Sequence, residues 1–161
     1  MISASFTYDG GRFPCRASPL ILGLDARKLK ERPDCLELLL NRDILAVNQD
    51  PAGLPPRLVH QTPPEGTPNL TSVEIEAQAF ARPLSGGRLA VLLLNRAPAA
   101  RRLRASWEQL RIAAAEERRV YDVVARHWLD EPARGEWAAT VPSHDVSFVI
   151  LAKSGLPSGL S

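Results

Sequence analysis

The sequence predicts a mainly β protein, a C-terminal antiparallel β-sandwich preceded by a single β/α unit. Three observations predict this fold class: apolar residues recur at helical spacing early in the chain, a proline-rich stretch follows, and apolar and polar residues alternate beyond it. The 161 residues, 45% hydrophobic and 24% charged, suffice for one globular domain or one and a half. The predicted parts are 1–54, 55–72, 73–153 and a tail, 154–161.

The first part reads as a strand followed by a helix. The apolar run from Leu20 to Leu24 suits a strand that is buried on both faces. Pro33 fits the first turn of a helix, and Pro51 and Gly53 end it. Between them one apolar stripe recurs every three or four residues, formed by Leu36, Leu39, Leu40, Ile44 and Val47. Since one such unit cannot bury both faces alone, it docks on the sandwich or belongs to a larger sheet or barrel.

The remainder reads as an irregular connection and then short strands. Residues 55–72 contain five prolines and are expected to be extended and irregular. The stretch "VEIEAQAF" alternates apolar and polar residues, as a half-buried antiparallel strand does. Ser85–Gly87 predicts a turn, and Trp107–Arg119 is either a helical turn or a long loop. Strands are predicted over 73–80, 89–94, 102–107, 120–124, 136–141 and 146–152, the spacing typical of a β-sandwich.

The charge and the N-terminal residues exclude several classes of protein. The net charge of +2, from 20 basic and 18 acidic residues, gives no electrostatic footprint for nucleic acid or a membrane surface. No apolar run reaches the roughly 18 residues of a membrane span. The first residues lack the features of a signal peptide, so at face value the chain starts in the cytoplasm. Cys15 and Cys35 are too few for a disulfide framework or a zinc site, and one bridge or two free thiols both stay open.

Five blocks of sequence occur in an order that resembles one enzyme family. They are "ASPLILGLDARKL", "LLLNRDILAVNQDPAG", "RPLSGGRLAVLLLNR", "SWEQL" and "TVPSHDVSFVIL". Together they resemble the C-terminal third of the family-27 glycoside hydrolases, the α-galactosidases (melibiases) and the related α-N-acetylgalactosaminidases. The resemblance covers roughly residues 17 to 153, whereas residues 1–16 depart from the family pattern.

The resemblance implies a TIM barrel that carries the active site and a β-sandwich packed against it. A complete barrel needs roughly 250 residues, so residues 1–54 would be a β/α remnant of one. The implied reaction is retaining hydrolysis of terminal α-D-galactosyl residues by two aspartates, without a cofactor. Neither aspartate belongs to the five blocks, so both are expected upstream and this chain alone is expected to be inactive. The implied partners are α-galactosides for the full enzyme, and the missing barrel part or a homodimer mate for this chain.

The localisation is not fixed by the sequence, although the resemblance implies relatives that are often secreted or lysosomal. Asn69 opens the triplet Asn-Leu-Thr, which is a glycosylation acceptor if the chain is secreted.

Three aspartates are the candidates for chemistry within this chain. Asp25 follows the predicted strand at the end where barrel enzymes keep their catalytic groups, and an ion pair with Arg27 or a contact with a neighbouring loop is the alternative. Asp43 and Asp50 would lie about 10 Å apart along one helix, whereas a retaining pair needs about 5 to 5.5 Å. We therefore interpret Asp43 as a surface charge and Asp50 as a residue that closes a turn.

The stretch "NRDILAVNQDPAG" is interpreted as a junction between the helix and the sandwich. Asn48, Gln49 and Asp50 are expected to satisfy backbone groups where the helix ends, and Pro51 to redirect the chain.

The histidines and tryptophans give a second reading of function. No metal site is predicted, because no two histidines show ligand spacing among His60, His127 and His144. The tryptophans are either core residues or a platform on which a sugar stacks, namely Trp107, Trp128 and Trp137. A platform would make the chain a non-catalytic sugar-binding or scaffold module.

Overall fold

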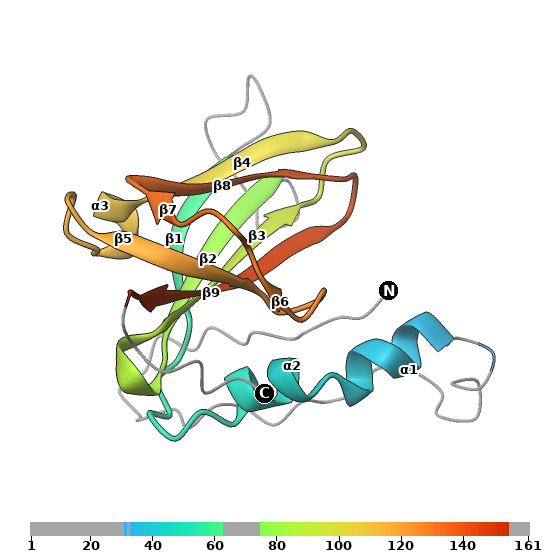
Figure 1. Cartoon of the computed structure of the whole chain (residues 1–161). Coiled ribbons are helices and arrows are strands. Elements are labelled where there is room, and N and C mark those ends of the chain that lie inside the picture. Colours follow the sequence, from blue (N-terminus) through green and yellow to red (C-terminus); the bar gives the residue numbers. More distant parts are fainter. Residues whose placement is uncertain (1–30, 32, 63–74, 155–161) are drawn as a thin grey trace, which may run out of the picture.

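The computed structural model describes residues 31, 33–62 and 75–154 (Figure 1). Several sequence predictions fall outside the described residues: the strand from Leu20 to Leu24, Asp25, Cys15, Asn69, the atypical residues 1–16 and the tail from residue 155 onward.

Two short helices, α1 (Pro33–Leu40) and α2 (Arg42–Asn48), stand where the sequence predicted one. The prediction is wrong at Asn41, whose backbone is extended, with φ −67° and ψ 108°. Its side-chain oxygen accepts hydrogen bonds from the backbone N–H groups of Asp43 at 2.9 Å and Ile44 at 3.2 Å. This is an N-cap, which satisfies two N–H groups that a helix start leaves free, so a new helix begins here.

The larger part of the molecule is an antiparallel β-sandwich, which confirms the predicted fold class. Figure 1 shows β4 and β8 as a separate layer over β2 and β3. The seven-stranded sheet has the order β1-β2-β3-β9-β5-β6, with β7 paired to β5, and the second sheet contains β4 and β8. The bounds are β1 (Arg57–Thr62), β2 (Ala77–Pro83), β3 (Leu89–Asn95), β4 (Arg101–Ser106), β5 (Glu117–Asp122), β6 (His127–Trp128), β7 (Ala133–Arg134), β8 (Glu136–Val141) and β9 (Val146–Lys153).

Most strands lie close to the ranges that the sequence predicts. β8 has the predicted bounds, and β3, β4 and β9 differ by one residue at one or both ends. β5 begins three residues early, at Glu117, and β2 runs from Ala77 through Pro83. The stretch from Trp107 opens with the helical turn α3 (Trp107–Leu110).

The expectation of an irregular connection is wrong for residues 57–62, which form β1. This strand pairs with β2 in the register Arg57↔Ala81 and Thr62↔Ala77. Pro55 and Pro56 precede the strand, and β1 is the edge of its sheet, where a proline beside a strand removes no ladder hydrogen bond. Proline content alone therefore does not distinguish this edge strand from a loop.

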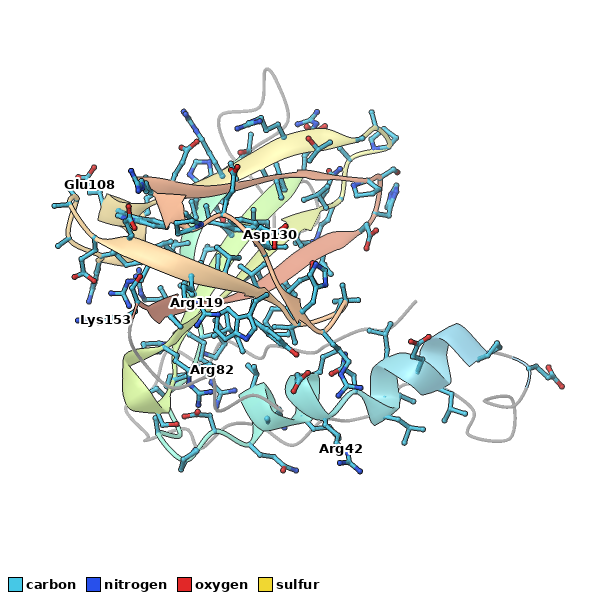
Figure 2. The ribbon with its side chains drawn as sticks, in the orientation of Figure 1. Arg42, Arg82, Glu108, Arg119, Asp130 and Lys153 are labelled. Atoms are coloured by element: carbon cyan, nitrogen blue, oxygen red, sulfur yellow. The ribbon has the colours of Figure 1, made fainter. Side chains whose placement is uncertain are left out.

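Two buried clusters lie on the two faces of the large sheet. The cluster between the sheets contains Val91 and Leu93 of β3, Trp107 of α3, and apolar residues of β5 and β9. The cluster on the outer face joins Val47 of α2 to Leu84, Ala90, Tyr121, Val123 and Ile150. Because α2 covers this outer face, β3 is apolar on both sides and its sequence is a continuous apolar run. In Figure 2, Arg82 lies between the sheet and α2, whereas Arg42 points away from the sandwich.

Candidate functional site: the junction of helix α2 with the sandwich

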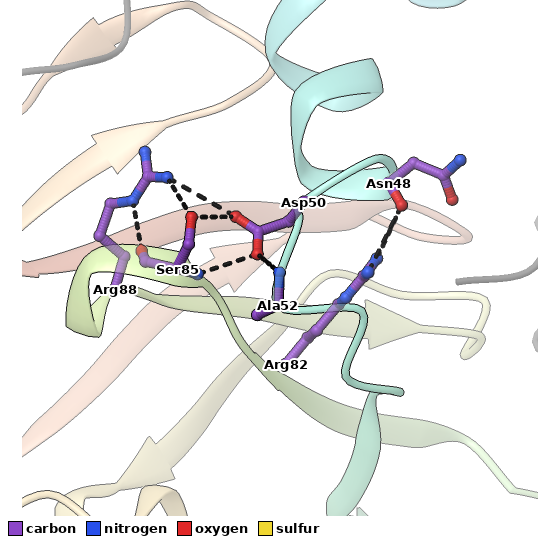
Figure 3. Close-up of polar contacts among 6 residues, drawn as sticks. All are labelled: Asn48, Asp50, Ala52, Arg82, Ser85 and Arg88. Carbon is purple, nitrogen blue, oxygen red and sulfur yellow. Dashed lines mark hydrogen bonds and ion pairs between the residues drawn. The ribbon is translucent and has the colours of Figure 1, made fainter. Parts of the chain in front are cut away.

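Asp50 ties the end of α2 to the turn between β2 and β3. The residue is 6% exposed. Its Oδ1 accepts hydrogen bonds from the backbone N–H groups of Ala52 at 3.0 Å and Ser85 at 2.9 Å. Oδ2 accepts a hydrogen bond from the Ser85 hydroxyl at 2.8 Å and lies 3.6 Å from the Arg88 guanidinium. Figure 3 shows these contacts converging on the one carboxylate. Asp50 is thus held by groups of its own turn and of the sandwich together.

These contacts set the protonation of Asp50. Burial raises the pKa of the carboxyl, but the hydrogen bonds from Ser85 and Ala52 and the charge of Arg88 outweigh burial and bring the pKa below the ordinary 3.8. The group is therefore ionised at neutral pH. A general acid needs a pKa near the working pH, so Asp50 is unsuited to that role.

The turn that receives Asp50 is shaped by two glycines, as predicted for Ser85–Gly87. Gly86 and Gly87 both have φ 69°, a left-handed conformation that glycine adopts without steric cost. Arg88 then donates from Nε to the carbonyl of Ser85 at 3.1 Å. This bond holds the serine where its N–H and hydroxyl both reach Asp50.

Arg82 of β2 caps the same end of α2. It is 8% exposed, and both terminal nitrogens lie 3.4 Å from the carbonyl oxygen of Asn48. The pKa of Arg82 is lowered, because the effect of burial outweighs the opposing charge of Asp50. A cation at this end stabilises the negative end of the helix dipole. Asn48 takes part through its carbonyl, Gln49 donates its backbone N–H to Leu45 at 2.9 Å, and Pro51 is exposed.

The other end of α2 is fixed to β5 and to the segment that follows it. Asp43 Oδ2 accepts hydrogen bonds from the Tyr121 hydroxyl at 2.8 Å and from Arg126 Nε at 3.2 Å. Asn41 donates from Nδ2 to the Val123 carbonyl at 2.9 Å. The interpretation of Asp43 as a surface charge is wrong, since the residue is 5% exposed. The sequence did indicate that Asp43 is buried, because it precedes the apolar Val47 by four residues and so lies on the same face of the helix.

Replacing Tyr121 with phenylalanine is expected to lower the free energy of unfolding by about 2 kcal/mol, the range for a buried hydrogen bond to a charged group. The edge contact with Trp128, with ring centroids 5.2 Å apart, is retained in the variant. Burial and the hydrogen bond to Asp43 raise the pKa of Tyr121 above 10.0. The neutral phenol therefore stabilises the fold below that pH, and the stabilisation disappears as the pH rises through the raised pKa.

Urea unfolding of Tyr121→Phe, Asp43→Asn and the double variant measures this coupling. A loss below about 0.5 kcal/mol, the size of an ordinary surface substitution, would contradict the contact.

The tryptophans do not form a stacking platform in the described part of the chain. Trp107 is 2% exposed and donates from Nε1 to the Glu116 carbonyl at 2.7 Å, so it is a core residue. One face of Trp128 is covered by the Arg119 guanidinium, 4.3 Å from the ring centroid. Trp137 is half-buried and packs against the core between the sheets.

The structure keeps the three histidines on separate elements, with His60 on β1, His127 on β6 and His144 between β8 and β9. Within residues 31, 33–62 and 75–154, no three His, Cys, Asp or Glu side chains gather closely enough to hold a metal ion. Neither the length nor the apolar character of any described helix suffices to cross a membrane.

Known proteins match both the sandwich and the helices that precede it. Residues 74–151 match the family model described as the alpha galactosidase C-terminal beta sandwich domain. Alpha-galactosidase 3 of Arabidopsis thaliana is 30% identical over 134 residues, which are 83% of this chain and 28% of that protein. The alpha-galactosidase of Coffea arabica is 29% identical over 134 residues, 83% of this chain and 32% of that protein.

Solved structures share the fold. The α-galactosidase of Saccharomyces cerevisiae, determined with raffinose, superposes with a TM-score of 0.70 at 17% identity, over 90% of this chain and 45% of that one. α-Galactosidase I of Mortierella vinacea gives a TM-score of 0.65 at 22% identity, over 92% of this chain and 38% of that one.

The fold and the junction define a class of protein, a C-terminal β-sandwich domain with a helix of the preceding unit attached to its outer face. The chain belongs to the α-galactosidase family and corresponds to the C-terminal portion of its members, which confirms the resemblance of the five blocks. It spans about a third or less of the length of the two curated relatives, 28% and 32%.

Proposed function

We propose that this chain is the supporting portion of a retaining α-galactosidase, an enzyme that hydrolyses terminal α-D-galactosyl residues, and that the chain alone does not cleave them. In this proposal both catalytic aspartates belong to a part of the enzyme outside this chain. The observation that carries it is the state of Asp50, a buried carboxylate whose oxygens accept bonds from Ala52 and Ser85 and which is ionised at neutral pH.

Retaining hydrolysis makes two demands that Asp50 and Asp43 do not fulfil. One carboxyl must protonate the leaving group, which requires a raised pKa, whereas the pKa of Asp50 is lowered. The second must be free to attack the sugar, whereas Asp43 is buried and bonded to Tyr121 and Arg126. Both aspartates are therefore assigned to holding α2 in place.

The proposed role of the chain is to fix the last helix of a barrel against the sandwich. Asn41 and Asp43 hold the start of α2 to β5 and the segment after it. Asp50 and Arg82 hold the end of α2 to β2 and the following turn. Contacts at both ends resist sliding and tilting of the helix. Residues 1–54 then act as the terminal β/α unit of the barrel, 55–72 as the connection and 73–153 as the sandwich that supports it.

Hydrolysis of a nitrophenyl α-galactoside by the purified chain tests the proposal. We expect no nitrophenol release above the buffer rate, and the same result for Asp25→Ala and Asp50→Asn. A melting curve shows that each protein tested is folded. Turnover by the wild-type chain that disappears in either variant would overturn the proposal, because it would place catalytic chemistry within these residues.

A further inference from the structure

We draw no further inference here: the strongest candidate, the apolar surface patch of helix α1 on which Leu36 and Leu40 are exposed, carries none, because nothing in the described part of the chain shows what covers it.

Discussion

Asp50→Ala is expected to lower the free energy of unfolding of this protein by about 3 kcal/mol. The substitution removes the carboxylate that accepts part-buried hydrogen bonds from the N–H groups of Ser85 and Ala52 and from the Ser85 hydroxyl, and a hydrogen bond to a charged group contributes about 1.5 to 3 kcal/mol. Asp50→Asn keeps one acceptor oxygen and should lose roughly half as much. Urea unfolding followed by circular dichroism measures the difference. Asp130→Ala, which removes an exposed carboxylate, is the matched control and should change stability by less than about 0.5 kcal/mol.

The stability difference between wild type and Asp50→Ala is expected to depend on pH. The pKa of Asp50 is lowered in the folded protein, so its contribution is complete above the ordinary 3.8 and is lost as the pH falls through the lower folded value. The stability difference between wild type and Asp50→Ala should therefore be constant near neutrality and shrink below about pH 4. A difference that stayed constant into stronger acid would show that the carboxylate charge does not stabilise the fold.

Trp107→Ala is expected to cost about 4 kcal/mol, within the range for removing a buried tryptophan from a core. The side chain fills the space between the sheets, and its Nε1 donor bonds the Glu116 carbonyl. Chemical unfolding followed by circular dichroism, which does not depend on tryptophan fluorescence, measures the loss. Trp128→Ala, at a half-buried position in contact with Tyr121 and Arg119, should cost less than half as much.

The two readings of the tryptophans predict opposite outcomes for this variant. A core residue changes stability and has no effect on a sugar titration. If Trp107→Ala kept its full stability and instead abolished heat released with a galactoside, the assignment of Trp107 to the core would be wrong.

The sandwich strands could be predicted from the sequence because their apolar alternation reflects burial directly. "LAVLLLN" and "EWAATV" became β3 and β8 within a residue of the expected bounds. The paired glycines predicted the turn after β2, since positive φ is a local property of the chain. The family could also be predicted, because four of the five blocks lie on described elements of this fold or on its junction, and the first block lies outside the described residues.

The break between α1 and α2 and the role of Asp43 were not predicted. Asn41 caps α2 locally, but the contacts that bury Asn41 and Asp43 come from residues far away in the sequence. Asn41 looks like an ordinary residue within a helix until Val123, 82 positions further on, offers its carbonyl. Asp43 looks exposed until Tyr121 and Arg126 approach it. β1 was missed for a related reason, since an edge strand next to prolines is recognised by its pairing with β2 and hardly by its own residues.

The position of β9 has a consequence for synthesis of the protein. This strand, the last described element of the chain, lies in the middle of the large sheet, with Leu151 opposite Leu89 on one side and Val120 on the other. β3 and β5 therefore have no partner on their facing edges until Lys153 has left the ribosome. Folding of the sheet must wait until β9 has emerged, and the nascent chain exposes two apolar edges in the meantime.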